Sequence, residues 1–311
     1  MKAVRAAPPE VRVVDIDEPE GDGELIRIRS ASICASDFIY MELGSHEILG
    51  HELAGITADG EAVAIEGIFG CNECEWCRRG NYNLCARATL DVLGLTVKGG
   101  MSEYFRAPRH VLTPLPAGLS VEDGSLVEPT AVAWHSCRVG GVGPDTSVAV
   151  VGAGAIGLLA GVAAQAMGAP EVVIEARHPH QRQAAERFGL ATPTEMYDVV
   201  IETGGSEGSL HRAVELARPQ GTVVVVGVHG ADVAWPHQLA FAKEVRTAPA
   251  LGYCQTSHGR EFGEAAGLLA ARPEIAETLI THRLPIEDAE QAFRIAADRS
   301  AGTFRVVIDP S

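Results

Sequence analysis

The sequence lacks any apolar run of the about 18 residues that cross a membrane, and its first residues lack the apolar core of a signal peptide. It also lacks an excess of positive charge, since 25 Lys and Arg face 41 Asp and Glu and the formal net charge is −16. Such a charge argues against nucleic acids and anionic membranes as main partners. We therefore expect a cytoplasmic protein that acts on a small molecule.

Disulfide bonding is not indicated either. Of the seven cysteines in 311 residues, four cluster between positions 71 and 85, which is more typical of metal binding in a reducing cytosol. Apolar residues make up 46% of the chain and charged residues 21%, which suits a globular protein of about two domains. The sequence shows no internal repeat and no low-complexity segment.

The segment 148–175, VAVVGAGAIGLLAGVAAQAMGAPEVVIE, has the pattern of a dinucleotide-binding unit. An apolar strand ends in a glycine-rich turn, and a helix of small and aliphatic residues leads to a second strand. Gly152 permits the tight turn, Gly154 lets the backbone approach a pyrophosphate, and Gly157 lets the helix pack closely on the strand. The pyrophosphate then binds free N–H groups at the positive end of the helix dipole.

Four cysteines indicate a structural metal site. Their spacing is C-x2-C-x2-C-x7-C, and they are Cys71, Cys74, Cys77 and Cys85. Two-residue spacings let a tight turn present its sulfurs to one ion, and the seven-residue return closes a tetrahedral shell of thiolates. We expect a closed zinc site whose binding energy folds this loop.

A second set of zinc-ligand types is dispersed along the chain. Cys34, His51 and Glu52 offer a thiolate, an imidazole and a carboxylate. Glu128 stands in an apolar setting just before an expected helix, and the sequence leaves open whether it is solvated or held in a cleft. No partner is evident for six other histidines: His110, His211, His229, His237, His258 and His282.

Strand and helix patterns alternate after the glycine-rich turn, which predicts a parallel sheet covered on both faces. Strands are expected at 198–202, 222–226 and 244–251, and helices at 206–216 and 259–270. A helix at 287–297 and a last strand at 303–308 follow. From this pattern we place a dinucleotide-binding domain at 139–280 and a metal-binding domain at 1–138, completed by 281–311.

Together these motifs resemble the zinc-containing medium-chain alcohol dehydrogenases over nearly the whole chain. The resemblance is carried by ICASD, GHE, the four-cysteine loop, VEPTAVAWHSCRVGG, GAGAIG, IETGG, RPQGTVVVVG and ITHRLP. The EP-x-AVA-x-H segment is most similar to the polyol and threonine dehydrogenase branch, in which a glutamate joins the catalytic metal shell. The family implies an α/β fold, with a Rossmann doubly wound parallel sheet domain and a mostly β GroES-like catalytic domain.

The resemblance also implies a catalytic zinc, held by Cys34, His51, Glu52 and Glu128. The glutamates would bind it directly or through water, and they would exchange as substrate enters. Asp37 matches the acid that fixes the tautomer of the histidine ligand, and Ser36 matches the hydroxyl that passes the substrate proton onward.

Two departures from the family concern the substrate side. Position 39, where the family often has the histidine that ends the proton relay, is Ile39, so the relay ends in water, in Tyr40 or in another group. The chain between Glu52 and Cys71 is also shorter than is usual in the family.

The nicotinamide preference depends on the end of the second strand. An acid about 20 positions after the glycines normally binds the ribose 2′-hydroxyl of NAD. Ala176 stands there, and Arg177, with His178 or Arg182, offers positive charge for a 2′-phosphate, so NADP is favoured. A shift of one residue would instead make Glu175 the ribose acid and favour NAD. The family match further assigns cofactor contacts to Gly152, Gly154, Ala155, Ile156, Gly157, Thr203, Gly227 and Arg305.

The expected function is hydride transfer between NADP(H) and a secondary alcohol or polyol, or the corresponding ketone or aldehyde, with two zinc ions per chain. Two alternatives stay open: a medium-chain reductase of C=C or C=N bonds without catalytic zinc, and a non-enzymatic nucleotide-binding protein. By resemblance the chain forms a homodimer or homotetramer.

Overall fold

The computed structural model describes residues 1–228, 232–257, 259–298 and 301–310. It divides into two compact units: the first combines Met1–Glu128 with Cys254–Ser311, and the second is Pro129–Tyr253. Two of the histidines for which the sequence indicates no partner, His229 and His258, lie outside the described residues. Among the described helices, none is long and apolar enough to cross a membrane.

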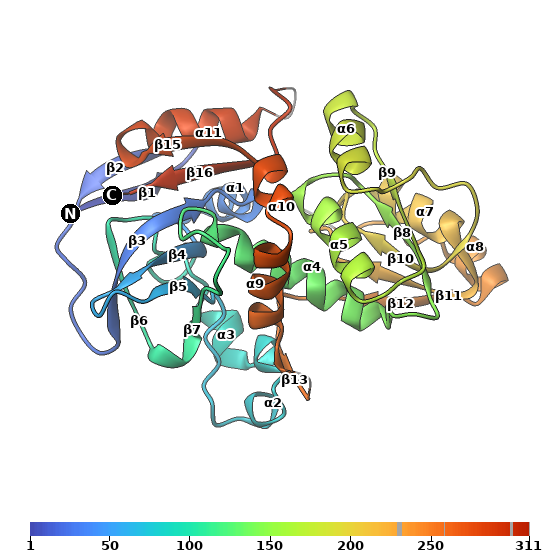
Figure 1. Cartoon of the computed structure of the whole chain (residues 1–311), viewed down its shortest axis with the longest axis horizontal. Coiled ribbons are helices and arrows are strands. Elements are labelled where there is room, and N and C mark those ends of the chain that lie inside the picture. Colours follow the sequence, from blue (N-terminus) through green and yellow to red (C-terminus); the bar gives the residue numbers. More distant parts are fainter. Residues whose placement is uncertain (229–231, 258, 299–300, 311) are drawn as a thin grey trace. The chain divides into compact units, whose positions relative to one another are not determined.

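The first unit is built on an extensive, mostly antiparallel sheet (Figure 1). Its path runs β15-β16-β3-β4-β5-β7, and β6 pairs with β3 beside that path. The sheet strands are β3 (Glu24–Ser32), β4 (Glu52–Thr57), β5 (Ala62–Ile65), β6 (Tyr104–Ala107), β7 (Leu112–Pro114), β15 (Ile280–Pro285) and β16 (Arg305–Asp309). A separate pair, β1 (Lys2–Ala7) and β2 (Glu10–Asp15), precedes it, and a short hairpin joins β13 (Gln255–Thr256) to β14 (Gly259–Arg260).

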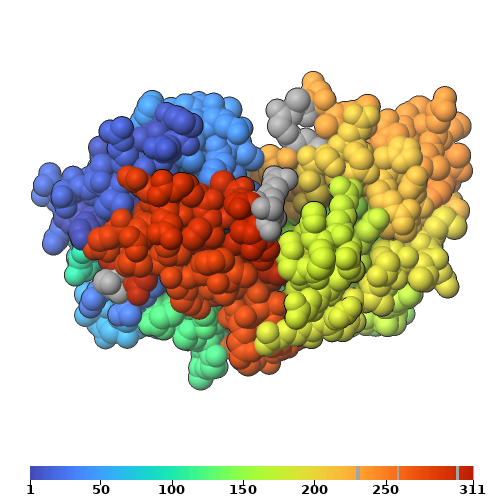
Figure 2. All heavy atoms as spheres, turned by 90° about the horizontal axis from the view of Figure 1, so that it is seen from above, coloured from blue at the N-terminus to red at the C-terminus, as the bar shows by residue number. Residues whose placement is uncertain are grey.

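Short helices surround this sheet. They are α1 (Ala35–Glu42), α2 (Glu75–Arg78), α3 (Ala86–Leu90), α9 (Glu261–Ala271), α10 (Glu274–Leu279) and α11 (Ala289–Ala297), with single 3₁₀ turns at Tyr82–Leu84, Arg109–Val111, Gly124–Leu126 and Ile286–Asp288. Alternating residues of β3, such as Ile26 and Ile28, are fully buried and pack with Phe293 of α11 and Ile308 of β16 in one apolar core. Because β16 pairs with β3, the C-terminal segment lies against the N-terminal strands, red against blue in Figure 2.

The second unit carries a parallel sheet in the order β12-β11-β10-β8-β9. Its elements are α4 (Val127–Gly140), which starts in the last residues of the first unit, then β8 (Ser147–Val151), α5 (Ala155–Ala166), β9 (Glu171–Glu175), α6 (Pro179–Arg187), β10 (Tyr197–Glu202), α7 (Glu207–Leu216), β11 (Ala217–Val225), α8 (His237–Lys243) and β12 (Arg246–Pro249). The order reverses between β8 and β10, which confirms the predicted doubly wound sheet. On the outer side of β9, Val173 forms a single parallel bridge with Ala191.

The division between the units differs from the boundaries predicted near residues 138 and 280. The sequence pattern places residues 254–280 in the dinucleotide-binding domain, but in the structure they belong to the first unit. The reason is a set of contacts with segments distant in sequence: the Gln255 N–H donates to Gly80 O over 2.9 Å, Arg260 pairs with Glu66, and α9 packs on β7. The helical pattern of 259–270 gave no sign of which sheet it would cover.

Candidate active site and metal centres

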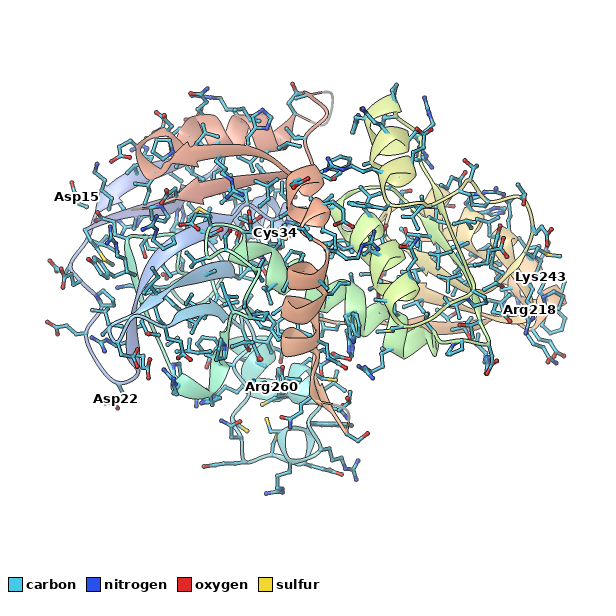
Figure 3. All side chains as sticks on the ribbon, viewed as in Figure 1. Asp15, Asp22, Cys34, Arg218, Lys243 and Arg260 are labelled. Carbon is cyan, nitrogen blue, oxygen red and sulfur yellow. The ribbon has the colours of Figure 1, made fainter. Side chains whose placement is uncertain are left out.

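Three potential metal ligands converge at one end of the first unit's sheet. Cys34 precedes α1, directly after β3, and His51 and Glu52 stand at the start of β4 (Cys34 is labelled in Figure 3). Antiparallel pairing of β3 and β4, with Ser32 opposite Glu52, brings the two segments together. The ligand atoms of Cys34, His51 and Glu52 lie within 4.8 Å of one another. A thiolate, an imidazole and a carboxylate at this separation fit a zinc ion.

Glu128, the fourth expected ligand, is not part of this group. Among the described residues, the cluster whose ligand atoms lie within 4.8 Å holds Cys34, His51 and Glu52 alone. Glu128 is 8% exposed at the start of α4, so the structure places it in a buried position rather than on a solvated helix start. The charge of Glu128 raises the pKa of Arg305, although by less than Glu52 and Cys34 do.

Asp37 lies beside the imidazole of the cluster. Its side chain is fully buried, its Oδ2 accepts the backbone N–H of Cys34 over 2.9 Å, and its Oδ1 lies 3.5 Å from His51 Nδ1. Burial raises the pKa of Asp37. Burial lowers the pKa of His51, but the charge of Asp37 and a hydrogen bond with Cys34 raise it well above its ordinary value. With Nδ1 directed to Asp37, Nε2 is the nitrogen available to a metal.

Two hydroxyl-bearing side chains lie near the same histidine. Ser36 lies on its Nε2 side, and Tyr40 lies against its ring. Ser36 Oγ is 3.1 Å from His51 Nε2, and the Tyr40 ring is tilted against the imidazole with centroids 5.7 Å apart. Burial raises the pKa of Tyr40, while the charge of His51 and a hydrogen bond with Ser36 lower it in part. Both hydroxyl groups that the sequence proposed for the proton path are therefore near the metal ligands.

Arg305 belongs to this cluster, which the sequence did not reveal. It is 5% exposed, and its Nη1 donates to both carboxylate oxygens of Glu52, at 2.8 and 3.0 Å, and to the carbonyl oxygen of Ile33 at 3.3 Å. Burial lowers the pKa of Arg305, but Glu52 and Cys34 raise it further, so the guanidinium stays charged. Glu52 can bind a metal directly only by giving up part of this pairing. The expected contact of Arg305 with a cofactor pyrophosphate stays a prediction.

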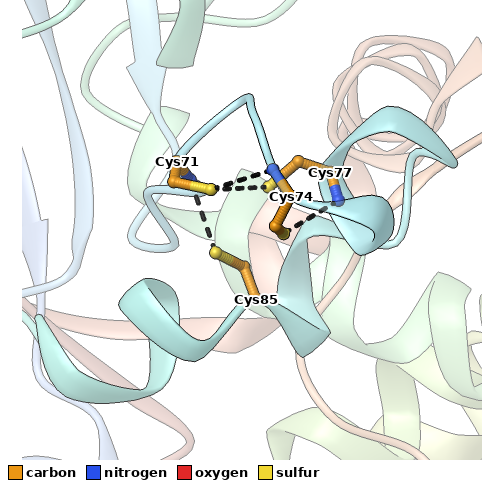
Figure 4. Close-up of side chains that lie close together, drawn as sticks. All are labelled: Cys71, Cys74, Cys77 and Cys85. Carbon is orange, nitrogen blue, oxygen red and sulfur yellow. Dashed lines mark hydrogen bonds between the residues drawn. The ribbon is translucent and has the colours of Figure 1, made fainter.

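The four-cysteine loop forms a second cluster (Figure 4). The sulfurs of Cys71, Cys74, Cys77 and Cys85 lie within 4.8 Å of one another, and Cys71 Sγ is 3.9 Å from Cys77 Sγ. Zinc–sulfur bonds of about 2.3 Å in a tetrahedron place the sulfurs about 3.8 Å apart, so this separation fits one zinc ion. Burial raises the pKa of Cys85, but backbone N–H groups, first that of Cys71, lower it to about 6 and favour the thiolate.

A partly exposed arginine of the β13–β14 hairpin contacts both a buried carboxylate and this loop. Arg260 Nη2 lies 2.8 Å from Oε1 of the fully buried Glu66, and the guanidinium also stacks 5.5 Å from the ring centroid of Tyr82 (Arg260 is labelled in Figure 3). Tyr82 lies within the cysteine loop, between the third and fourth cysteines. Burial raises the pKa of Glu66 to about 7, although Arg260 opposes the rise.

This carboxyl group should make stability depend on pH. A folded-state pKa of about 7 against an ordinary value of 4.5 means that the folded state binds more protons between those values, so the free energy of unfolding falls as pH rises from 5 to 8. The fall attributable to Glu66 should reach about 3 kcal/mol. We expect Glu66→Gln to remove this component in thermal or urea unfolding, whereas the exposed Glu10→Gln should keep it. Parallel pH profiles for wild type and Glu66→Gln would contradict the assignment.

In the second unit, the glycine-rich turn has the close contacts that the sequence predicted. Gly152 has φ +106°, and a Cβ there would lie 2.9 Å from Thr203 Oγ1. Thr203 in turn donates its hydroxyl to Gly152 O over 2.9 Å. A Cβ at Gly154, which precedes α5, would meet open space. The other expected cofactor residues of this turn, Ala155, Ile156 and Gly157, form the first turn of α5.

The expected ribose segment follows β9. His178 precedes α6, and the Arg182 guanidinium donates from Nη1 to Arg177 O over 2.7 Å. Glu175, the alternative ribose acid, is paired with Arg212 of α7, with Oε2 3.0 Å from Nε. Ala176 lies between them without a carboxylate of its own. Glu175 is thus already paired with a guanidinium of α7.

Comparisons with known proteins agree with this architecture. Residues 21–117 match the family model of the alcohol dehydrogenase GroES-like domain, and residues 155–270 match that of the zinc-binding dehydrogenases. A relative described as probable D-xylulose reductase A of Neosartorya fischeri is 29% identical to this chain. The aligned region covers 87% of this chain and 85% of the relative.

Solved structures extend the similarity to the whole chain. Galactitol-1-phosphate dehydrogenase from Escherichia coli is 29% identical, with a TM-score of 0.90 and 100% of both chains covered. A structure described as a zinc-binding dehydrogenase from Sinorhizobium meliloti, bound to NADP, is 27% identical, with a TM-score of 0.85 and 99% of both chains covered. The chain therefore belongs to the zinc-containing medium-chain alcohol dehydrogenase family and is an enzyme of that family.

Proposed function

We propose that this enzyme transfers a hydride between NADP(H) and a secondary alcohol or polyol, or the corresponding ketone or aldehyde. The convergence of Cys34, His51 and Glu52 carries the proposal, because a protein that only binds nucleotide has no need of an open metal site. The names of the relatives, D-xylulose reductase and galactitol-1-phosphate dehydrogenase, support a polyol or a related sugar alcohol as the substrate class.

The chain's own residues have defined tasks in this reaction. When bound, zinc supplies a Lewis acid and the nicotinamide takes up or gives the hydride. Cys34, His51 and Glu52 would hold the zinc, and Asp37 keeps the imidazole in the tautomer that leaves Nε2 free. Ser36 Oγ, 3.1 Å from that nitrogen, is positioned to take the alcohol proton and pass it outward.

We further propose two zinc ions per chain, the second in the four-cysteine loop, and a homodimer or homotetramer. Metal analysis and light scattering of the purified protein test these points. One zinc per chain with full activity would favour the alternative reductase of C=C or C=N bonds.

The proposal also includes a preference for NADP over NAD. Ala176 provides no carboxylate to repel a 2′-phosphate, Arg177 offers positive charge beside it, His178 offers a ring N–H, and Glu175 is paired with Arg212. A panel of alcohols and ketones assayed with both nicotinamides tests substrate class and cofactor together. Equal or better kcat/KM with NAD would contradict the NADP assignment.

Ala176→Asp should reverse the preference. The new carboxylate repels a 2′-phosphate and binds a ribose 2′-hydroxyl, so the ratio of kcat/KM for NADP to that for NAD should fall at least about tenfold. Glu175→Gln is the matched control, and we expect it to leave the ratio unchanged because Glu175 pairs with Arg212. A loss of NAD use in Glu175→Gln would instead identify Glu175 as the ribose acid.

A further inference from the structure

Glu202 is a buried carboxylate at the end of the central strand β10. It is 0% exposed and follows the apolar residues Val199–Ile201. A charged group at such a position is costly unless hydrogen bonds compensate it. None of the metal clusters in the described part of the chain includes Glu202, so its role lies elsewhere.

The side chain and main chain of Glu202 fix two separate loops. Oε1 accepts the backbone N–H groups of Gly204 and Gly205, at 2.7 and 2.8 Å, and the hydroxyl of Ser209 at 2.7 Å. The carbonyl oxygen of Glu202 accepts the N–H groups of Val226 and Gly227, at 2.9 and 3.0 Å. The loop after β10 and the loop after β11 are thus both hydrogen-bonded to one residue.

The two loops are also in backbone contact. A Cβ at Gly227 would collide with the backbone nitrogen of Gly205 and lie 2.8 Å from Glu202 Oε2. Gly205 has φ +64°, and a Cβ there would lie 2.8 Å from Val228 O. We therefore expect a displacement of Glu202 to affect both Gly204–Gly205 and Val226–Gly227, because these two backbone segments lie in close contact.

These loops lie at the position where a doubly wound sheet binds its ligand. The strand order reverses between β8 and β10, and ligands bind outside the carboxyl ends of the strands at such a switch point. Thr203, the residue next to Glu202, contacts the glycine-rich turn after β8, with its hydroxyl 2.9 Å from Gly152 O. The segment 203–205 accordingly connects the glycines that Glu202 holds to the turn expected to bind the pyrophosphate.

We propose that Glu202 is a positioning residue for the nicotinamide cofactor. It holds Gly204–Gly205 and Val226–Gly227 in the conformation that forms one wall of the cofactor crevice in the second unit, and it acts through these backbones rather than by contact with the cofactor. The proposal rests on the proposed use of a nicotinamide. It adds a determinant of affinity outside the glycine-rich turn and the ribose segment.

Direct binding of NADPH to the full chain, followed by fluorescence or calorimetry, tests the proposal. Glu202→Ala should raise the Kd about tenfold or more, because three hydrogen bonds to a charged acceptor are lost. Glu202→Gln should stay within about threefold of wild type, since its amide oxygen can still accept the glycine N–H groups. Saturating NADPH should restore most of kcat in both variants, so that KM changes more than kcat.

Gly208→Ala is the matched control. Gly208 lies in α7 beside Ser209, and a Cβ there would meet nothing within 4 Å, so NADPH binding should be unchanged. Should Glu202→Ala not fold, Ser209→Ala, which removes one of the three donors, should still raise the Kd about threefold.

The outcomes separate this inference from the proposed function. Wild type that binds neither NADPH nor NADH contradicts the proposed function. Wild type that binds NADPH, with an unchanged Kd in folded Glu202→Ala or in Ser209→Ala, overturns the role of Glu202 alone. Equal losses in Glu202→Gln and Glu202→Ala would also overturn it, because the acceptor geometry would then be irrelevant.

Discussion

Replacing Cys34 with serine should lower kcat at least about a thousandfold, which corresponds to about 4 kcal/mol of transition-state stabilisation. Cys34 supplies the thiolate of the three-ligand cluster, and a serine hydroxyl is a poor substitute for it at neutral pH. We expect NADPH affinity to stay within about threefold of wild type, since the variant leaves the glycine-rich turn intact. Steady-state kinetics, direct NADPH binding and zinc analysis together measure the effect.

Cys137→Ser provides the control for this substitution. Cys137 is fully buried, and its sulfur lies 3.4 Å from Ala160 O, so serine can keep that contact without touching a metal ligand. Its zinc content and kcat should stay close to those of wild type. Near-normal turnover by Cys34→Ser would remove Cys34 from the reaction and with it the proposed catalytic zinc.

Loss of a ligand in the four-cysteine loop should lower the stability of the fold. Cys85→Ser removes one of four thiolates from a site whose geometry fits one ion, and zinc binding at such sites is worth about 10–16 kcal/mol in isolated peptides. We expect the free energy of unfolding to fall by about 3–5 kcal/mol and the Tm by about 10 °C. Hydrogen exchange should rise across residues 71–90, and zinc content should fall by one ion per chain.

The same experiment reports on the contacts around the loop. Because Tyr82 and Arg260 join the loop to the β13–β14 hairpin, exchange should also rise in residues 255–257. The sheet strands β3 and β4 should remain protected. Unchanged exchange throughout the loop in Cys85→Ser would show that these thiolates do not hold a structural metal.

Local patterns in the sequence were enough to predict much of this molecule. The strand pattern predicted 198–202, close to β10 (Tyr197–Glu202), and the helix pattern predicted 206–216, close to α7 (Glu207–Leu216). The glycine-rich turn and the cysteine spacing are short-range motifs, so their members also lie together in the fold. Each of these features depends on neighbours within about twenty residues.

Features that depend on distant pairing could not be predicted. Arg305 and Glu52 are 253 residues apart in sequence, and nothing near either residue signals the other. The same holds for Arg260 and Glu66, and for the assignment of residues 254–280 to the first unit. The short helices α8 and α10 were missed because six or seven residues give too few turns for a periodic pattern.

The composite make-up of the first unit has a consequence for biosynthesis. Residues 129–253 are contiguous, so the whole dinucleotide-binding unit is synthesised before β15 and β16, which complete the first unit. Strand β6 already pairs with Glu24–Arg27 on one edge of β3, but Ala31 and Ser32 on that edge must wait for β16 before they are paired. A nascent chain halted before position 305 would thus leave this end of β3 unpaired and lack the guanidinium that neutralises Glu52.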